Sequence, residues 1–176
     1  MLNLFQGLNI PAVGSKMLKQ VQHDERKIWN HLMPKPQAWQ LNPASYPFSH
    51  RTETRFADMD VLGHINNVSM AGLFEHGRGM FNHAIEVQRR APGQRWLIAS
   101  VNLDYIAEAH FPEHVDVACG ISRIGNSSWD IASAAFQGGE CKATCITTIV
   151  LTNADGSAPI PDDLREEFER LRVNAA

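Results

Sequence analysis

The chain has 176 residues, of which 44% are hydrophobic and 20% are charged, and its formal net charge is −3. This length predicts one domain with a substantial core, and the charge offers no basic surface for nucleic acid. Residues 1–15 are uncharged, but they are short, are interrupted by Gly7 and Pro11 and have no basic residues ahead of them, so they predict neither a membrane-spanning helix nor a secretory signal. Three cysteines without a CxxC pair favour reduced thiols within strands and a cytoplasmic location.

The first 47 residues differ in composition from the rest of the chain. The polar segment 15–33 predicts one helix, and four prolines in residues 34–47 disfavour regular structure there. We therefore expect residues 1–47 to form an arm or linker, disordered in part, ahead of a domain that spans residues 48–176.

A strand and a helix are predicted at the start of this domain. Residues 48–56 alternate between two faces, which is typical of a strand. From Asn67 to Val87 the apolar residues recur with the period of a helix. Three glycines weaken this helix by about 1 kcal/mol each relative to alanine, and we expect them where a sheet packs close to it: Gly72, Gly77 and Gly79.

The remainder predicts four strands and a last helix. The strands span residues 96–109, 114–125, 127–137 and 140–153, with hairpin turns at 125–127 and 137–140. An amphipathic helix begins at Pro161. This order predicts an α+β fold in which one antiparallel sheet curls around one long helix.

The segment DMDVLGHINNVSM, residues 58–70, gathers polar side chains just ahead of the long helix. Gly63 permits a tight turn, and either Asn66 or Asn67 suits the N-cap. The unpaired N–H groups of a helix start can hold a developing oxyanion. An ionised aspartate beside them can attack a carbonyl or deprotonate water. Asp58 and Asp60 have equal claims by spacing, and both also suit ordinary turns and caps.

Residues 55–81, RFADMDVLGHINNVSMAGLFEHGRGMF, resemble the signature of the 4-hydroxybenzoyl-CoA thioesterase-like family of hotdog-fold proteins. The family pattern is approximately R-(Y/F)-x-D-x-D-x-x-G-H-(V/I)-N-N, followed by a helix with Glu and Arg. The likeness continues through the later strands to about residue 171. It implies a hotdog fold, in which an antiparallel sheet wraps a long central helix, and hydrolysis of acyl-CoA thioesters without a cofactor.

The resemblance also implies roles for individual residues of the loop. Asp60 falls on the catalytic aspartate of the family, as nucleophile or general base. The amide of Asn67, with Val68 beside it, falls on the group that polarises the thioester carbonyl. His64 falls on a histidine that the acyl-CoA thioesterase members have and the hydroxybenzoyl-specific members lack, and we expect it to orient water or Asp60. Met70 stands where many relatives have tyrosine near the acyl pocket, which leaves the acyl preference open.

Further candidates lie outside this loop. A related hotdog branch uses a helix carboxylate for catalysis, which makes Glu75 a second catalytic candidate, although an ion pair with Arg78 is the simpler interpretation. The hairpin after the third strand resembles the turn that contacts the CoA nucleotide in similar thioesterases, and its residues also suit an ordinary polar turn: Arg123, Asn126, Ser127 and Ser128.

No metal is expected. His110 and His114 are four residues apart, but Pro112 disfavours a helix between them and no third ligand is evident.

One sheet leaves an open edge, so we expect edge pairing into a homodimer, or a tetramer built from dimers. Two alternatives to thioester hydrolysis remain: a non-catalytic binder of acyl-CoA or an acyl carrier, and a hotdog hydratase or dehydratase.

Overall fold

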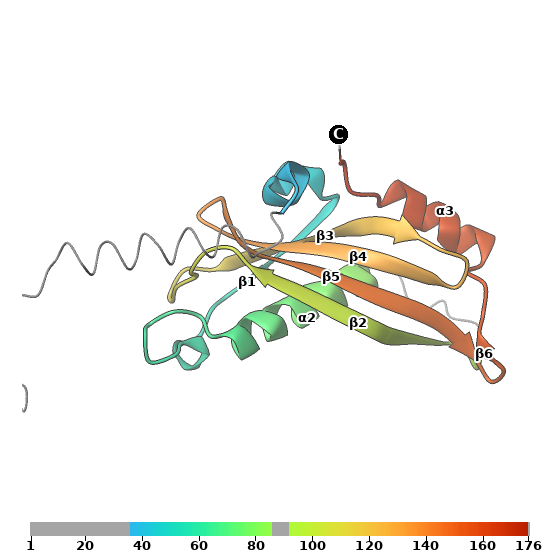
Figure 1. Cartoon of the computed structure of the whole chain (residues 1–176), viewed down its shortest axis with the longest axis horizontal. Helices are drawn as coiled ribbons and strands as arrows, with labels where there is room; N and C mark the ends of the chain where they lie inside the picture. Colours follow the sequence, from blue (N-terminus) through green and yellow to red (C-terminus); the bar gives the residue numbers. More distant parts are fainter. Residues whose placement is uncertain (1–35, 86–91, 176) are drawn as a thin grey trace, which may run out of the picture. The chain divides into compact units, whose positions relative to one another are not determined.

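The computed structural model describes residues 36–85 and 92–175, all within the unit Pro36–Ala176. The helix predicted at 15–33 lies outside the described residues. Five long strands form one antiparallel sheet in the order β1-β3-β4-β5-β2, and the short β6 pairs with β5 (Figure 1). The strands are β1 (Phe48–Thr52), β2 (Arg95–Tyr105), β3 (Val115–Ile124), β4 (Ser128–Gln137), β5 (Glu140–Asn153) and β6 (Gly156–Ser157).

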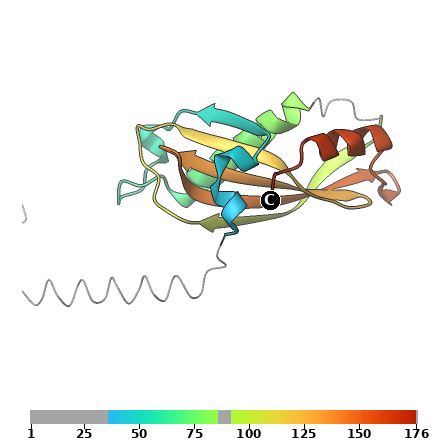
Figure 2. The same cartoon turned by 90° about the horizontal axis from the view of Figure 1, so that it is seen from above.

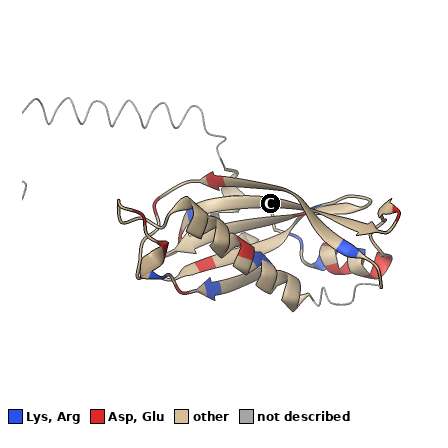
Figure 3. Ribbon diagram, turned by 90° about the horizontal axis from the view of Figure 1, so that it is seen from below, with Lys and Arg blue, Asp and Glu red and all other residues tan. Residues whose placement is uncertain are grey.

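The long helix α2 (Asn67–Ala84) covers one face of this sheet (Figures 1 and 3). Its buried face packs on β1, β3 and β4 through Met70, Phe74 and Phe81. A Cβ built on Gly77 would overlap the side chain of Val117 on β3, so only glycine permits this close approach. This confirms for Gly77 the close packing that the sequence predicts, whereas nothing lies within 4 Å of a Cβ on Gly72 or Gly79.

The opposite face is covered by residues ahead of the first strand. Two 3-10 helices, η1 (Ala38–Leu41) and η2 (Pro43–Ser45), lie over it together with the end of the chain (Figure 2). Tyr46 is buried among small residues of β3 and β4 and packs edge-on against Phe136. Small side chains such as Ala118 and Ala132 leave the room that this aromatic packing needs.

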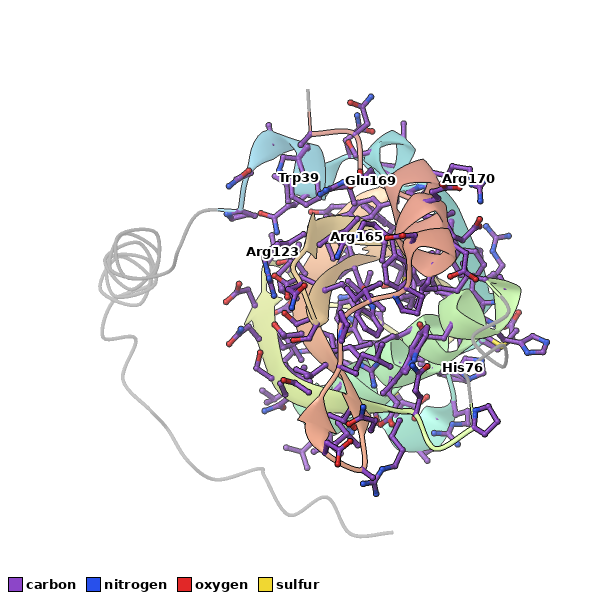
Figure 4. All side chains as sticks on the ribbon, turned by 90° about the vertical axis from the view of Figure 1, so that its right-hand side faces the viewer. Trp39, His76, Arg123, Arg165, Glu169 and Arg170 are labelled. Atoms are coloured by element: carbon purple, nitrogen blue, oxygen red, sulfur yellow. The ribbon has the colours of Figure 1, made fainter. Side chains whose placement is uncertain are left out.

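The last helix, α3 (Asp162–Arg170), packs beside β3. Its buried Phe168 contacts Trp129 of β4, with ring centroids 4.9 Å apart, and Trp96 of β2 at 6.2 Å. The Arg165 guanidinium donates a hydrogen bond to the Gly125 carbonyl oxygen, which ties α3 to the β3–β4 hairpin. Figure 4 looks onto this end of the sheet, with Arg123 and Arg165 labelled.

These elements confirm the α+β hotdog architecture, and two predicted boundaries are wrong. The first strand ends at Thr52, and Phe56–Asp58 forms a 3-10 helix, η3, because the carboxylate of Asp58 accepts a hydrogen bond from the backbone N–H of Arg55. The second strand ends at Tyr105, and a loop of residues 106–114 leads to β3.

Three free cysteines are buried in β3 and β5, as the sequence predicts. Burial raises the pKa of Cys119 to about 12 and that of Cys141 to about 11. Both thiols are therefore protonated at neutral pH, and neither is a nucleophile. Among the described helices, none is long and apolar enough to cross a membrane.

Candidate active site

The two aspartates of the loop before α2 lie in different surroundings. Asp58 is 3% exposed, and its carboxylate binds the side chain of Arg55 at 2.9 Å and the backbone N–H of Arg55 at 2.7 Å. Its carbonyl oxygen accepts hydrogen bonds from the backbone and the side chain of Asn66. Burial alone would raise the pKa of Asp58, but the hydrogen bonds from Arg55 lower it below the usual value. Asp58 therefore serves to hold the loop against the start of α2.

Asp60 is exposed, and only one of its carboxylate oxygens is engaged. Oδ1 accepts hydrogen bonds from the N–H groups of Leu62 (2.8 Å) and His64 (3.2 Å), and no described residue donates a hydrogen bond to Oδ2. Gly63 completes the turn with a φ of +84°, which confirms its predicted conformational role. Desolvation by the surrounding loop acts to raise the pKa of Asp60, but hydrogen bonds from the backbone N–H groups of His64, Leu62 and Gly63 lower it overall, so the carboxylate is ionised at neutral pH.

The start of α2 presents free backbone donors beside this loop. Asn66, rather than Asn67, is the N-cap: its side chain accepts a hydrogen bond from Ser69 N–H at 2.9 Å. Within the described part of the chain, nothing accepts a hydrogen bond from the N–H of Asn67 or Val68, as expected for a first helical turn. The Val68 side chain is exposed, whereas Met70 is buried beneath the turn.

Tyr105, at the end of β2, donates a hydrogen bond from its hydroxyl to the carbonyl oxygen of Asn67 at 3.1 Å. This hydrogen bond ties the first residue of α2 to β2, although the two residues are 38 positions apart in the sequence. Sequence reasoning missed it, because nothing local links the two residues.

The His64 ring lies against the loop of residues 106–114. Its Nε2 is 3.4 Å from a carboxylate oxygen of Glu108, and its ring is edge-on to that of His110, with centroids 5.3 Å apart. The loop is held by Gln137, whose buried amide makes three hydrogen bonds to the backbone of His110 and Glu113. Sequence reasoning missed Glu108 and Gln137, since neither belongs to a local motif.

A groove of about 260 Å³ runs between the second half of α2 and strands β2 and β5. Glu75 and Gly79 line it from the helix, and Trp96 and Ile149 line it from the strands. The expected Glu75–Arg78 pair is present at 3.8 Å and joins an exposed carboxylate to a buried guanidinium that also donates a hydrogen bond to Thr147. Glu75 lies eight residues, or about 12 Å, along α2 from Asn67.

The β3–β4 hairpin lies at the opposite end of the sheet from the loop before α2 (Figure 1). Arg123 forms a two-pronged ion pair with Asp130, at 2.6 and 2.8 Å, and contacts the Ser128 hydroxyl. The Ser127 carbonyl oxygen accepts a hydrogen bond from Leu151 N–H. Within one chain, these three residues are not brought together with Asp60.

Four other described histidines lie in separate surroundings. His110 packs on His64, whereas His114 lies 3.8 Å from Asp116, and His76 packs on His50. In the described parts of the chain, no group of three or more His, Cys, Asp or Glu residues could hold a metal ion.

Residues 54–168 match the family model of the thioesterase-like superfamily. The chain belongs to this superfamily. The structure of a predicted thioesterase from Bacillus stearothermophilus is similar, with 30% identity, 71% of this chain and 96% of that chain covered, and a TM-score of 0.64. A thioesterase from Thermus thermophilus, whose structure is complexed with coenzyme A and Zn, is 25% identical to this chain. The similarity covers 72% of this chain and 95% of that chain, with a TM-score of 0.64.

Among curated proteins, the uncharacterized protein YsmA of Bacillus subtilis is 24% identical over 129 residues, which cover 72% of this chain and 86% of YsmA. Membership of the thioesterase-like superfamily supports thioester hydrolysis as the general activity of this chain.

Proposed function

We propose that this thioesterase-like protein hydrolyses acyl-CoA thioesters to a free acid and CoA, with Asp60 as the catalytic carboxylate. The observation that carries the proposal is an ionised carboxylate with one open oxygen, in the loop that leads into the unpaired N–H groups of a helix start. The similar thioesterase from Thermus thermophilus is complexed with coenzyme A, which supports CoA as the thiol portion of the substrate.

The thioester carbonyl oxygen accepts a hydrogen bond from the amide of Asn67, with Val68 beside it, so that charge developing on this oxygen is stabilised. Asp60 either takes a proton from the attacking water or attacks the carbonyl carbon itself. In the second case, water then cleaves the resulting anhydride. In the first case the carbon–sulfur bond breaks and the CoA thiolate takes up the proton that Asp60 removed from water. In the second case this bond breaks as the anhydride forms, and the proton released when water cleaves the anhydride passes to the CoA thiolate. His64 orients the water or Asp60, and Glu75 is the alternative catalytic carboxylate.

The acyl group extends from the start of α2 past Met70 along the helix, toward the groove beside Gly79. A benzoyl group is too short to reach the level of Glu75, about 12 Å along the axis. A long aliphatic chain reaches it. The groove therefore favours longer acyl chains in this proposal.

A homodimer, alone or within a tetramer, completes the site. The edge strand β2 exposes apolar side chains that a second copy would cover: Leu97, Ile98, Val101 and Tyr105. Two-fold pairing of β2 edges reverses the strand direction, so the β3–β4 hairpin of one copy lies at the same end as Asp60 of the other. Arg123, Ser127 and Ser128 then contact the CoA nucleotide across the interface.

The buried free thiols accord with a location in the reducing cytoplasm.

The deciding experiment is CoA release from short, medium, long and aromatic acyl-CoAs by the wild type, Asp60→Asn and the control Asp155→Asn. Asp155 is exposed in the turn after β5, so its substitution removes the same charge away from the site. We expect turnover by the wild type and the control, and loss of turnover in Asp60→Asn with the fold intact. Turnover that survives in Asp60→Asn transfers the chemistry to Glu75. Binding of CoA without turnover of any thioester makes the protein a non-catalytic binder.

A further inference from the structure

The loop of residues 106–114 is fixed against the loop that carries Asp60. The backbone N–H of Ile65 donates a hydrogen bond to the Ala109 carbonyl oxygen at 2.8 Å, which joins the two loops directly. This bond lies between the two side-chain contacts of the same loop with His64, those of Glu108 and His110. Residues 108–110 of this second loop therefore border residues 64 and 65 of the loop that carries Asp60.

A buried amide determines where this second loop lies. Gln137, at the end of β4, is 4% exposed. Its Oε1 accepts a hydrogen bond from His110 N–H at 2.8 Å, and its Nε2 donates to the carbonyl oxygens of His110 (2.7 Å) and Glu113 (3.1 Å). The Thr54 hydroxyl also donates to the Glu113 carbonyl oxygen at 2.8 Å. The backbone on the far side of Glu108, at His110 and Glu113, is thus held by hydrogen bonds to a buried amide, whereas the Glu108 side chain itself is exposed.

His64 connects this second loop to the catalytic carboxylate. Its backbone N–H binds Asp60 Oδ1, and its carbonyl oxygen accepts a hydrogen bond from Asp60 N–H at 2.9 Å. The ring of His64 lies against Glu108 and His110 of the second loop, so its backbone is tied to Asp60 and its side chain to residues 106–114.

We propose that Glu108 is a positioning residue of the active site, which holds the His64 imidazole in the orientation that hydrolysis needs. This inference rests on the proposed function. Glu108 acts through His64 and contacts no reacting atom. His110 supports the same arrangement through its ring contact.

The test compares kcat and KM for acyl-CoA hydrolysis by the wild type, Glu108→Gln and Glu113→Gln. Glu113 is an exposed carboxylate of the same loop whose side chain makes no ion pair within the described residues, so Glu113→Gln removes an equal charge without touching His64. We expect kcat to fall by about a few-fold in Glu108→Gln with KM unchanged, as the loss of an exposed ion pair allows, and neither constant to change in Glu113→Gln. A kcat for Glu108→Gln equal to that of the wild type, or an equal loss in Glu113→Gln, overturns the inference.

A second measurement separates this inference from the proposed function. The chemical shifts of the His64 ring protons, assigned by comparison with His64→Gln, are measured by NMR at one pH in the wild type, Glu108→Gln and Glu113→Gln. Ring signals that move only in Glu108→Gln support the contact even if no thioester is hydrolysed. Ring signals that do not move in Glu108→Gln overturn the role of Glu108, even if Asp60-dependent hydrolysis has been established.

Discussion

Two polar turns of this protein, the loop before α2 and the β3–β4 hairpin, have similar compositions but differ in how their polar groups are used. In the hairpin, Arg123 is paired with Asp130. Burial acts to raise the pKa of Asp130, but hydrogen bonds from Arg123 and Thr148 lower it overall. In the loop, Asp60 keeps an open oxygen, and the first helical N–H groups have no acceptor among the described residues.

The difference shows that polar composition alone does not identify a catalytic turn. Paired groups such as Arg123 and Asp130 already satisfy one another, so a ligand must compete with an existing ion pair. Open groups such as Asp60 Oδ2 are available to a substrate or a water molecule at no such cost.

The largest effect is expected from the turn that orients Asp60. Gly63→Val places a β-branched residue at a φ of +84°, which shifts the carboxylate from its position. We expect kcat to fall by about 100-fold, because such displacements of a catalytic group are costly. Gly93→Val is the matched control, with a φ of +82° and open space around its Cβ. Equal loss of kcat in both variants would contradict the assignment of the site to this turn.

Asp58→Asn separates the structural aspartate from the catalytic one. We expect it to lower the free energy of unfolding by about 1–2 kcal/mol at neutral pH, through weaker hydrogen bonds to Arg55, while turnover persists. The folded-state pKa of Asp58 is lowered, so its contribution to stability is present above the unfolded value of about 4 and is lost as the pH falls below it. Urea denaturation at neutral pH and at about pH 3 checks this, because the difference from the wild type should shrink in acid.

The groove beside α2 can be narrowed without a clash. Gly79 lines it, and nothing lies within 4 Å of a Cβ built there, so Gly79→Leu fills space instead of distorting the helix. We expect kcat/KM for long acyl-CoAs to fall several-fold while that for short acyl-CoAs is retained. Gly72→Leu, on the same helix but outside the groove lining, should leave this ratio unchanged. A shift in oligomeric state without a change in chain-length preference would instead indicate that the groove is an interface.

The smallest effect is expected at the hairpin. Arg123→Met should raise KM for acyl-CoA by a few-fold with kcat unchanged, since its guanidinium already binds Asp130. The same assay with acyl-pantetheine, which lacks the nucleotide, should show no difference between variant and wild type. A KM defect that persists with acyl-pantetheine would rule out a contact with the nucleotide.

Much of the fold follows from local patterns in the sequence. The period of the apolar residues predicts α2, the glycines at 138 and 139 predict the hairpin that their positive φ angles require, and Asn66 is one of two residues proposed as the cap. The resemblance of residues 55–81 adds the hotdog fold and directs attention to Asp60. These features depend on backbone preferences and periodicity, which neighbouring residues determine.

Only the tertiary structure decided how the polar groups are partnered. Sequence spacing left Asp58 and Asp60 equal, and folding buries the first against Arg55 while the second stays open. Likewise, Gln137 meets His110 across 27 residues, and the hairpin of Arg123 lies far from Asp60 within one chain. Burial and hydrogen-bond satisfaction depend on which distant strands pair, and no local pattern encodes that pairing.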